Sequence, residues 1–357
     1  MGKCISCHCQ IGGTFIYLLY IIGLVGRIEA IKLKCGSNLI FAFSPIFWSY
    51  LVTDTMAKIG TTFFFGSCMS SSHSEKTCFT LTYQNTSSKN NKFSSKRSIR
   101  FLSAIISNLA FMFQIFILLY NPYLEFLFTI VISYLLSLIM MKNKVYLCQI
   151  ICMLIICTLS ILREYFDGFY FGQYFYILIL GSIFMSSLSD SLTSVMCFYE
   201  GNLIRDWLFL QSIVQWFMCI IYIILVPSSF FKIYSFIFIS DLRGLISSVG
   251  FLVFSMIYYV CNGLILKQNP NPAFKVIPNT FGILFYYVFD ILNYLEYKTN
   301  KNKIIFTGFV LVVFFIISLF FNGVIQFKCC EYKNVEISKE IGLIEKDVEG
   351  KGNQNEY

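Results

Sequence analysis

Long apolar runs recur along this chain from one end to the other, and they constrain its fold more than any other feature. An apolar run of 18 or more residues spans hydrocarbon as a helix, whereas strands of a membrane β-barrel alternate in character over about ten residues. Lipid offers no partners to backbone N–H and C=O groups, so each run must satisfy its own as a helix. The sequence therefore predicts an all-α membrane protein.

The composition agrees with that class. Only 13% of the residues are charged and 57% are hydrophobic, whereas a soluble domain carries roughly 25% charged residues. The net charge of +8 would suggest nucleic acid as the partner of a soluble protein. Here the excess lies in loops and tails, where it orients helices in the bilayer. We therefore expect a lipid bilayer and no nucleic acid as partner.

Hydropathy predicts about ten transmembrane helices, of which the first has no small-residue cleavage site and is expected to be retained. With the N-terminus in the cytosol, the cytosolic segments carry almost twice as many Lys and Arg residues as the opposite side. This bias places both termini in the cytosol. The predicted spans are 11–31, 39–65, 101–120, 123–141, 145–162, 170–199, 207–227, 243–266, 277–296 and 304–326.

These spans divide into two sets of five. An odd number of helices in each half inverts the second half relative to the first, and inverted repeats with a site between them are a common transporter design. The predicted organisation is a cytosolic N-terminal segment at 1–10, a first repeat at 11–162 with a polar cytosolic loop at 66–100, a second repeat at 163–326, and a disordered cytosolic tail at 327–357.

Residues typical of enzymes are scarce. The two histidines, His8 and His73, lie in polar segments without the Ser or Cys and the orienting acid that nucleophilic catalysis requires. The chain has no G-x-x-x-x-G-K-[ST] loop, which argues against a P-loop ATP-driven pump. We therefore expect no enzymatic activity, no metal site and no cofactor.

Polar residues inside the predicted spans are better candidates, because they are costly in lipid and usually face a cavity or a partner. Asp54 and Lys58 lie four residues apart on one helix face,. They form either a self-neutralising pair that eases insertion or part of a central site in which Lys58 binds an anion. Asn108 is open to two interpretations as well, interhelical hydrogen bonding or ligand binding.

Lys267 and Lys275 flank a segment broken by two prolines after the eighth predicted helix. An interrupted helix exposes backbone donors, and with two lysines such a segment suits a phosphate. The alternative is an ordinary cytosolic loop with two snorkelling lysines.

The N-terminus fits a lipidation pattern. Gly2 lies where N-myristoylation occurs, and Cys4 follows as a candidate palmitoylation site,. The pattern is short, so a chance match is the alternative.

Several short segments resemble, in order, those of the nucleotide-sugar transporters in the drug/metabolite transporter superfamily. They include an acid shortly before Lys58, the helix-three stretch around Asn108, an aromatic pair followed by Glu200, and the Lys267–Lys275 segment. The resemblance extends over 45–325. It implies ten helices as two inverted five-helix repeats, in a Golgi or endoplasmic-reticulum antiporter that moves a nucleotide sugar, a UDP-sugar being favoured, against a nucleoside monophosphate.

One position departs from the family. Thr129 stands where the family carries a lysine in helix four, and Glu125 lies one turn before it. A lost cation and a gained acid should alter how phosphate or sugar is held. The substrate-binding residues we predict, some from the resemblance and some from position alone, are Asp54, Lys58, Asn108, Glu200, Tyr258, Tyr259, Asn262, Lys267 and Lys275.

Their expected roles differ. The three lysines would hold phosphate, Tyr258, Tyr259 or Tyr50 would stack on the base, and the two asparagines would bond base or sugar. Two other functions stay open: another superfamily transporter of a small metabolite, and a membrane receptor or scaffold without transport. Assembly as a homo-oligomer is also left open.

Overall fold

The computed structural model describes most of the predicted membrane region. The described residues are 3–35, 44–70, 97–120, 128–129, 131–136, 139, 147–167, 173–199, 203–235, 237, 242–268, 276–293 and 301–321. Apart from a bend and a short turn they are helical, and none of them lies in a β-strand. The all-helical class is therefore confirmed for this part of the chain.

The helices follow the predicted spans closely. Of the span predicted at 123–141 only short helical pieces are described, and α8 was not predicted as a helix. The helices are α1 (Lys3–Cys35), α2 (Pro45–Ser70), α3 (Arg97–Tyr120), α5 (Leu147–Asp167), α6 (Gln173–Tyr199), α7 (Leu203–Leu225), α8 (Ser229–Tyr234), α9 (Leu242–Gln268), α10 (Val276–Asn293) and α12 (Lys301–Phe321).

The helices at both ends of the predicted 66–100 loop are longer than expected, because α2 continues to Ser70 and α3 already begins at Arg97. The start of α2 has a local cause. Ser44 accepts a hydrogen bond from the backbone N–H of Ile46 at its side-chain oxygen (3.3 Å), and Pro45 occupies the first helical position, where no N–H is needed.

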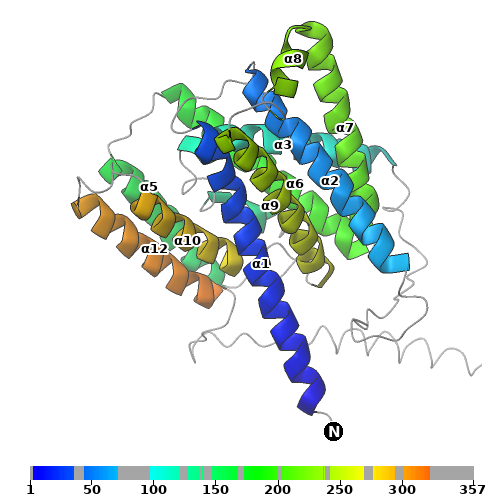
Figure 1. Cartoon of the computed structure of the whole chain (residues 1–357). Helices are drawn as coiled ribbons and strands as arrows, with labels where there is room; N and C mark the ends of the chain where they lie inside the picture. The colour runs from blue at the N-terminus through cyan, green and yellow to red at the C-terminus, as the bar shows by residue number, and fades with distance from the viewer. Residues whose placement is uncertain are drawn as a thin grey trace, which may run out of the picture.

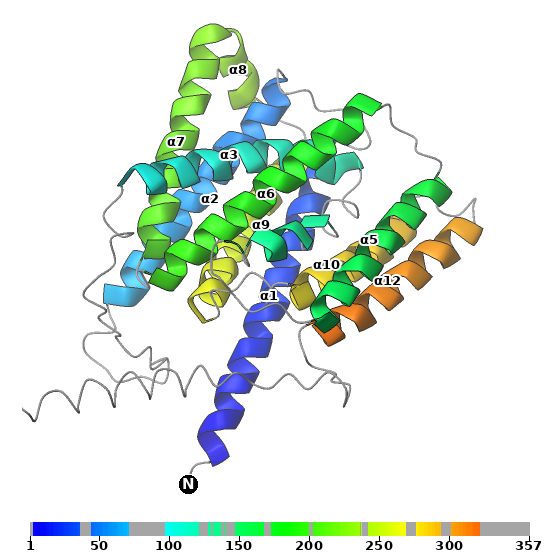
Figure 2. The same cartoon turned by 180° about the vertical axis from the view of Figure 1, so that it is seen from behind.

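Helix α1 lies at the centre of the packing (Figures 1 and 2). On one side α5, α10 and α12 pack together, and their core includes Ile21, Val25 and Ile28 of α1. On the other side α2, α3, α7 and α9 share a second core that includes Ala30 and Ile31 of α1. Since α1 contributes to both cores, it joins the two groups of helices.

The contact between α1 and α9 is unusually close. A Cβ atom added at Gly23 would lie 2.7 Å from the backbone nitrogen of Tyr258, and one at Gly26 would lie 2.4 Å from the Phe254 ring. Small residues permit such close approach of helices in membranes. This approach brings Arg27, the next residue of α1, against the aromatic face of α9.

Large apolar side chains lie on the outside of the helices as well as in the cores. Large apolar side chains face outward on many helices, for example Phe217 (66% exposed), Leu225 (74%) and Phe309 (62%), while buried positions include many Ser and Thr residues. Such broad apolar exposure marks a surface that contacts lipid or protein. Within the described part of the chain, two helices are long and apolar enough to cross a membrane, Ile204–Leu225 and Leu242–Leu266, with mean hydropathies of 2.1 and 2.0.

Candidate functional site

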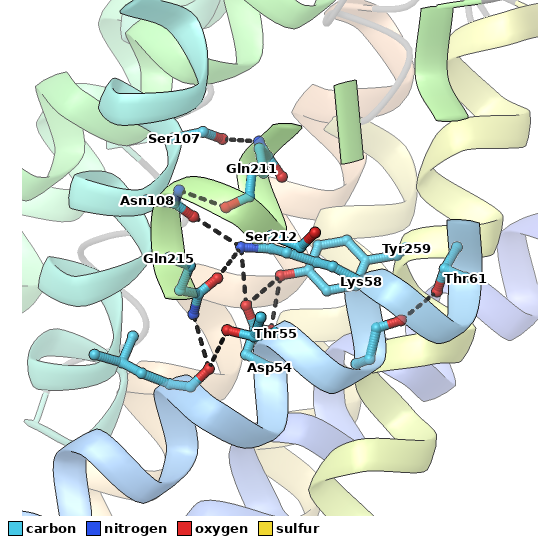
Figure 3. Close-up of polar contacts among 12 residues, drawn as sticks. Asp54, Thr55, Lys58, Thr61, Ser107, Asn108, Gln211, Ser212, Gln215 and Tyr259 are labelled. Carbon is cyan, nitrogen blue, oxygen red and sulfur yellow. Dashed lines mark hydrogen bonds and ion pairs between the residues drawn. The ribbon is translucent and has the colours of Figure 1, made fainter. Parts of the chain in front are cut away.

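A buried ion pair lies where α2 meets α3, α7 and α9 (Figure 3). Lys58 and Asp54 are four residues apart on α2, and their Nζ and Oδ2 atoms are 3.0 Å apart. Tyr259 of α9 donates its hydroxyl to both oxygens of Asp54, at 2.8 and 3.0 Å. Both ionic side chains are almost completely buried, which is tolerated only where charges are paired and hydrogen-bonded.

Lys58 makes two further hydrogen bonds. It donates to Oδ1 of Asn108 on α3 at 3.0 Å and to Oε1 of Gln215 on α7 at 2.6 Å. An ammonium group has three N–H donors, and Asp54, Asn108 and Gln215 supply three acceptors. The hydrogen-bonding capacity of Lys58 is therefore filled in this structure.

The side-chain amides near Lys58 donate hydrogen bonds to neighbouring helices. Asn108 donates to the backbone oxygen of Gln211 at 2.9 Å, and Gln215 donates to the backbone oxygen of Leu51 at 3.0 Å. Gln211 donates to Oγ of Ser107 at 2.5 Å. Gln211 and Gln215 lie one turn apart on α7, so both reach the same network and tie α2, α3 and α7 together.

Arg27 of α1 joins this network. The residue is only 7% exposed. A guanidinium nitrogen lies 3.7 Å from Oδ1 of Asp54. The guanidinium also faces aromatic rings, with 4.5 Å to the Tyr258 centroid and 5.1 Å to that of Phe111.

A small polar cavity of about 60 Å³ lies beside the network. Its lining comes from α1, α2, α3, α6, α7 and α9, and it includes two kinds of side chain. Cationic and aromatic side chains are Arg27, Lys58, Phe111, Trp207, Tyr258 and Tyr259. Side chains with hydroxyl, amide or carboxylate groups are Ser107, Gln114, Ser186, Ser189, Asp190, Gln211 and Asn262.

Several predicted site residues are therefore close in space. Lys58, Tyr258, Tyr259 and Asn262 line the cavity, while Asn108 and Asp54 contact Lys58 from behind. The spacing of Asp54 and Lys58 produced the ion pair that the sequence predicted, and their role toward a ligand stays a prediction.

Other predicted residues are elsewhere. Tyr50 shares a 2.8 Å hydrogen bond with Ser247 and packs against Phe251, so it is part of the core. Thr129 contributes its backbone oxygen, which accepts from Ser187 at 3.2 Å, and is not among the residues lining the cavity. Predictions that lie outside the described residues or side chains concern Gly2, Cys4, Glu200, Lys267 and Lys275.

The sequence analysis missed three members of the network, Arg27, Gln211 and Gln215, as binding candidates. Each is a polar residue inside an apolar run. The same feature had indicated Asn108, which does form hydrogen bonds between helices,. Arg27 was missed because charge near a helix end usually orients the helix.

A second hollow lies along α1, between α9 and α10. This groove measures about 860 Å³ and is lined mainly by apolar side chains, including Leu18, Ile22, Phe254 and Phe285, with Glu29 and Lys32 as its charged members. Lys32 donates a hydrogen bond to the hydroxyl of Tyr286. The groove thus differs in both size and chemistry from the polar cavity.

No model of a known protein family matches the chain, and no curated protein matches it either. Among the residues that the structure describes, no group of three or more His, Cys, Asp or Glu side chains is placed to hold a metal ion. The site must therefore be interpreted from its own geometry.

Proposed function

We propose that this chain is a multi-pass membrane transporter that moves an anionic solute by alternating access. The apolar exterior, the buried polar cluster and the two long apolar helices support a position within a lipid bilayer,. Ten spans as two inverted five-helix repeats, with both termini in the cytosol, form part of this proposal.

One observation carries it. Two buried cations, Arg27 and Lys58, line a polar cavity to which six helices contribute residues. Buried charge is expensive unless it is paired or functional. Arg27 and Lys58 share one ion-pair partner, Asp54, with the longer contact on Arg27. An anionic group of a solute would give Arg27 a close partner.

A nucleotide sugar suits both kinds of side chain that line the cavity. Its phosphates match the cations, its base can stack against Tyr258 or Trp207, and its hydroxyls can bond to Ser186, Ser189 and Asp190. We propose exchange of a nucleotide sugar, a UDP-sugar being favoured, for a nucleoside monophosphate across a Golgi or endoplasmic-reticulum membrane. Opposing gradients would drive the exchange, so no cofactor is invoked.

The small volume is compatible with transport only if the helices move. A space of about 60 Å³ holds about two waters, whereas sites for ligands of nucleotide size occupy several hundred Å³. The cavity is therefore too small for a nucleotide in this arrangement of the helices. Under the proposal, the helix movements of alternating access would widen it.

Exchange in proteoliposomes tests the proposal. Vesicles holding the purified chain would be preloaded with UMP, CMP or GMP and offered radiolabelled nucleotide sugars with the matching base. We expect uptake that internal monophosphate stimulates, and a lower rate for Asn262→Ala, which removes a cavity amide. Thr158→Ala removes an exposed hydroxyl on α5 and should match the unaltered chain. Absence of uptake with every pair, from folded protein, would exclude a nucleotide-sugar transporter.

A small zwitterionic metabolite is the second candidate. The cavity is lined by a carboxylate, Asp190, as well as by two cations. Asp190 could bind the ammonium group of such a metabolite, and a cation could bind its carboxylate. Uptake of labelled amino acids by the same vesicles, with no uptake of nucleotide sugars, would favour this candidate. Failure with both panels would leave a receptor or scaffold.

A further inference from the structure

We infer that Arg27, and not Lys58, is the residue that binds the anionic group of the ligand directly, and that this group is a phosphate. The inference rests on the proposed function in one respect, namely that a solute enters the polar cavity. It assigns different roles to the two buried cations. The arguments are the donors each cation has already used, the surroundings of Arg27, and a second polar group in the cavity wall.

The two cations differ in the partners they have. Lys58 has three acceptors for its three N–H donors, Asp54, Asn108 and Gln215, all within 3.0 Å. Arg27 has five N–H donors. Its ion contact within the described part of the chain is with Asp54 at 3.7 Å, which is longer than a hydrogen bond,. Donor capacity for a ligand therefore remains on Arg27.

Asp54 cannot balance both cations well. Its Oδ2 atom is 3.0 Å from Lys58, and both of its oxygens accept the Tyr259 hydroxyl. Arg27 stays protonated in proteins, so it cannot lose its charge when it is buried. Since Asp54 is shared with Lys58 and Tyr259, it gives Arg27 only a contact of 3.7 Å, and an incoming anion would supply the close acceptor that Arg27 lacks.

Aromatic rings hold the guanidinium without using its donors. Its central carbon lies 4.5 Å from the ring centroid of Tyr258, 5.1 Å from Phe111, 5.4 Å from Tyr259 and 5.8 Å from Phe251. Cation–π contacts attract the charge through ring faces, so N–H groups stay available at the edge of the guanidinium. A fixed planar guanidinium suits two-point binding of a phosphate.

A second group of the cavity has no partner in the described structure. Oδ1 of Asn262 is buried without a hydrogen bond, and Asn262 lines the same cavity as Arg27. A buried acceptor without a donor is costly. The ligand should therefore carry an N–H or O–H donor near its phosphate, as nucleotides and sugar phosphates do. Asp190, a carboxylate that also lines the cavity, would favour donor groups over a second anion.

Ligand binding to the purified full-length chain in detergent tests the assignment. Affinities for inorganic pyrophosphate, UMP and uridine would be measured by calorimetry for the unaltered chain, Arg27→Lys, Arg27→Gln and Arg205→Gln. Arg205 is an exposed arginine paired with Asp206 and serves as the matched control. We expect pyrophosphate and UMP to bind the unaltered chain and Arg205→Gln equally, and uridine to bind far more weakly.

The two Arg27 variants should differ in degree. Arg27→Gln should lose about 10- to 100-fold in affinity for both phosphates, the loss expected for charged hydrogen bonds. Arg27→Lys keeps the charge but not the planar fork, so it should bind several-fold more weakly than the unaltered chain and more tightly than Arg27→Gln. If Arg27→Gln does not fold, this weakening in Arg27→Lys remains a test.

The outcomes separate the inference from the proposed function. Unchanged UMP affinity in a folded Arg27→Gln, or full affinity in Arg27→Lys, would overturn the role of Arg27 even if nucleotide-sugar exchange is measured. Lack of any phosphate binding by the unaltered chain would overturn it too. Pyrophosphate binding that depends on Arg27, with no exchange of any nucleotide sugar, would support the inference and reject the proposed substrate.

Discussion

Two hollows lie along α1, and the smaller one is the better candidate for a functional site. The groove between α1, α9 and α10 measures about 860 Å³ and is mainly apolar, whereas the cavity beside Arg27 measures about 60 Å³ and is mainly polar. In a membrane protein an apolar groove on the outside can be filled by lipid. A buried charge has no such generic explanation. The smaller hollow is therefore the better candidate for function.

The same helix supplies charged residues to both hollows. Arg27 lines the cavity, while Glu29 and Lys32 line the groove. Successive helical residues are rotated by about 100°, so positions 27 and 29 point in nearly opposite directions. Arg27 is buried among aromatic rings, whereas Lys32 is partly exposed. Arg27 and Glu29 thus lie in different environments, the polar cavity and the apolar groove. Three sets of substitutions compare the two regions.

The largest effect should come from Asp54→Asn in the polar cluster. This change removes the ion-pair partner that Arg27 and Lys58 share, and breaking such a buried pair costs about 3–5 kcal/mol. Unfolding in mixed micelles, followed by tryptophan fluorescence, measures the loss. Asp206→Asn removes the acid of an exposed pair, in which Asp206 is 60% exposed, and should cost at most about 1 kcal/mol.

A second substitution checks the cause of the loss. Lys58→Met in the Asp54→Asn background removes one uncompensated charge, so it should restore part of the stability. If Asp54→Asn costs no more than Asp206→Asn, or if the two changes are simply additive, the coupling we infer within the cluster is wrong.

An intermediate effect should come from Gly23→Ala, at the close crossing of α1 and α9. The new methyl group would meet the backbone of Tyr258 at 2.7 Å, which forces the helices apart and costs about 1–3 kcal/mol. Gly181→Ala on α6 is the control, since no heavy atom lies within 4 Å of its added methyl. It should be neutral or slightly stabilising because Ala favours helix. Equal stability of the two variants would contradict the close crossing.

The smallest effect should come from the groove. Leu33→Ala alters a side chain that lines the groove and is 51% exposed, so stability should change by at most about 0.5 kcal/mol. Exchange in proteoliposomes should match the unaltered chain, whereas Asn262→Ala should slow it. If Leu33→Ala abolished exchange and Asn262→Ala did not, the groove would be the path of the substrate.

The sequence predicted most helix positions because its signal is local. Apolar run length located most of the helices, with errors of a few residues at most of their ends. The largest difference is at α1, which begins at Lys3, eight residues before the predicted start at 11. The described α2 begins at Pro45, six residues after the predicted start at 39, because hydropathy does not register the Ser44 cap. Helix α8, with only six residues (Ser229–Tyr234), is too short to give a hydropathy signal.

Contacts between residues of one helix could also be predicted from the sequence. The spacing of Asp54 and Lys58 predicted their contact, which the structure has at 3.0 Å. The hydrogen bond from Tyr259 to Asp54 links residues 205 positions apart, and no local pattern contains it. Tyr50 appeared an equal candidate for base stacking, yet it packs against Phe251 in the core.

The sequence by itself determined the helical class, the run lengths that suit a bilayer and the ion pair on α2, because each depends on residues within a few turns of one another. The tertiary structure decided which polar residues share a cavity and which cation keeps donors for a ligand. Arg27 shows the reason. Its burial depends on how closely α1 approaches α9 at Gly23 and Gly26, and the aromatic rings around it come from α3 and α9, so only the packed helices bring these groups together.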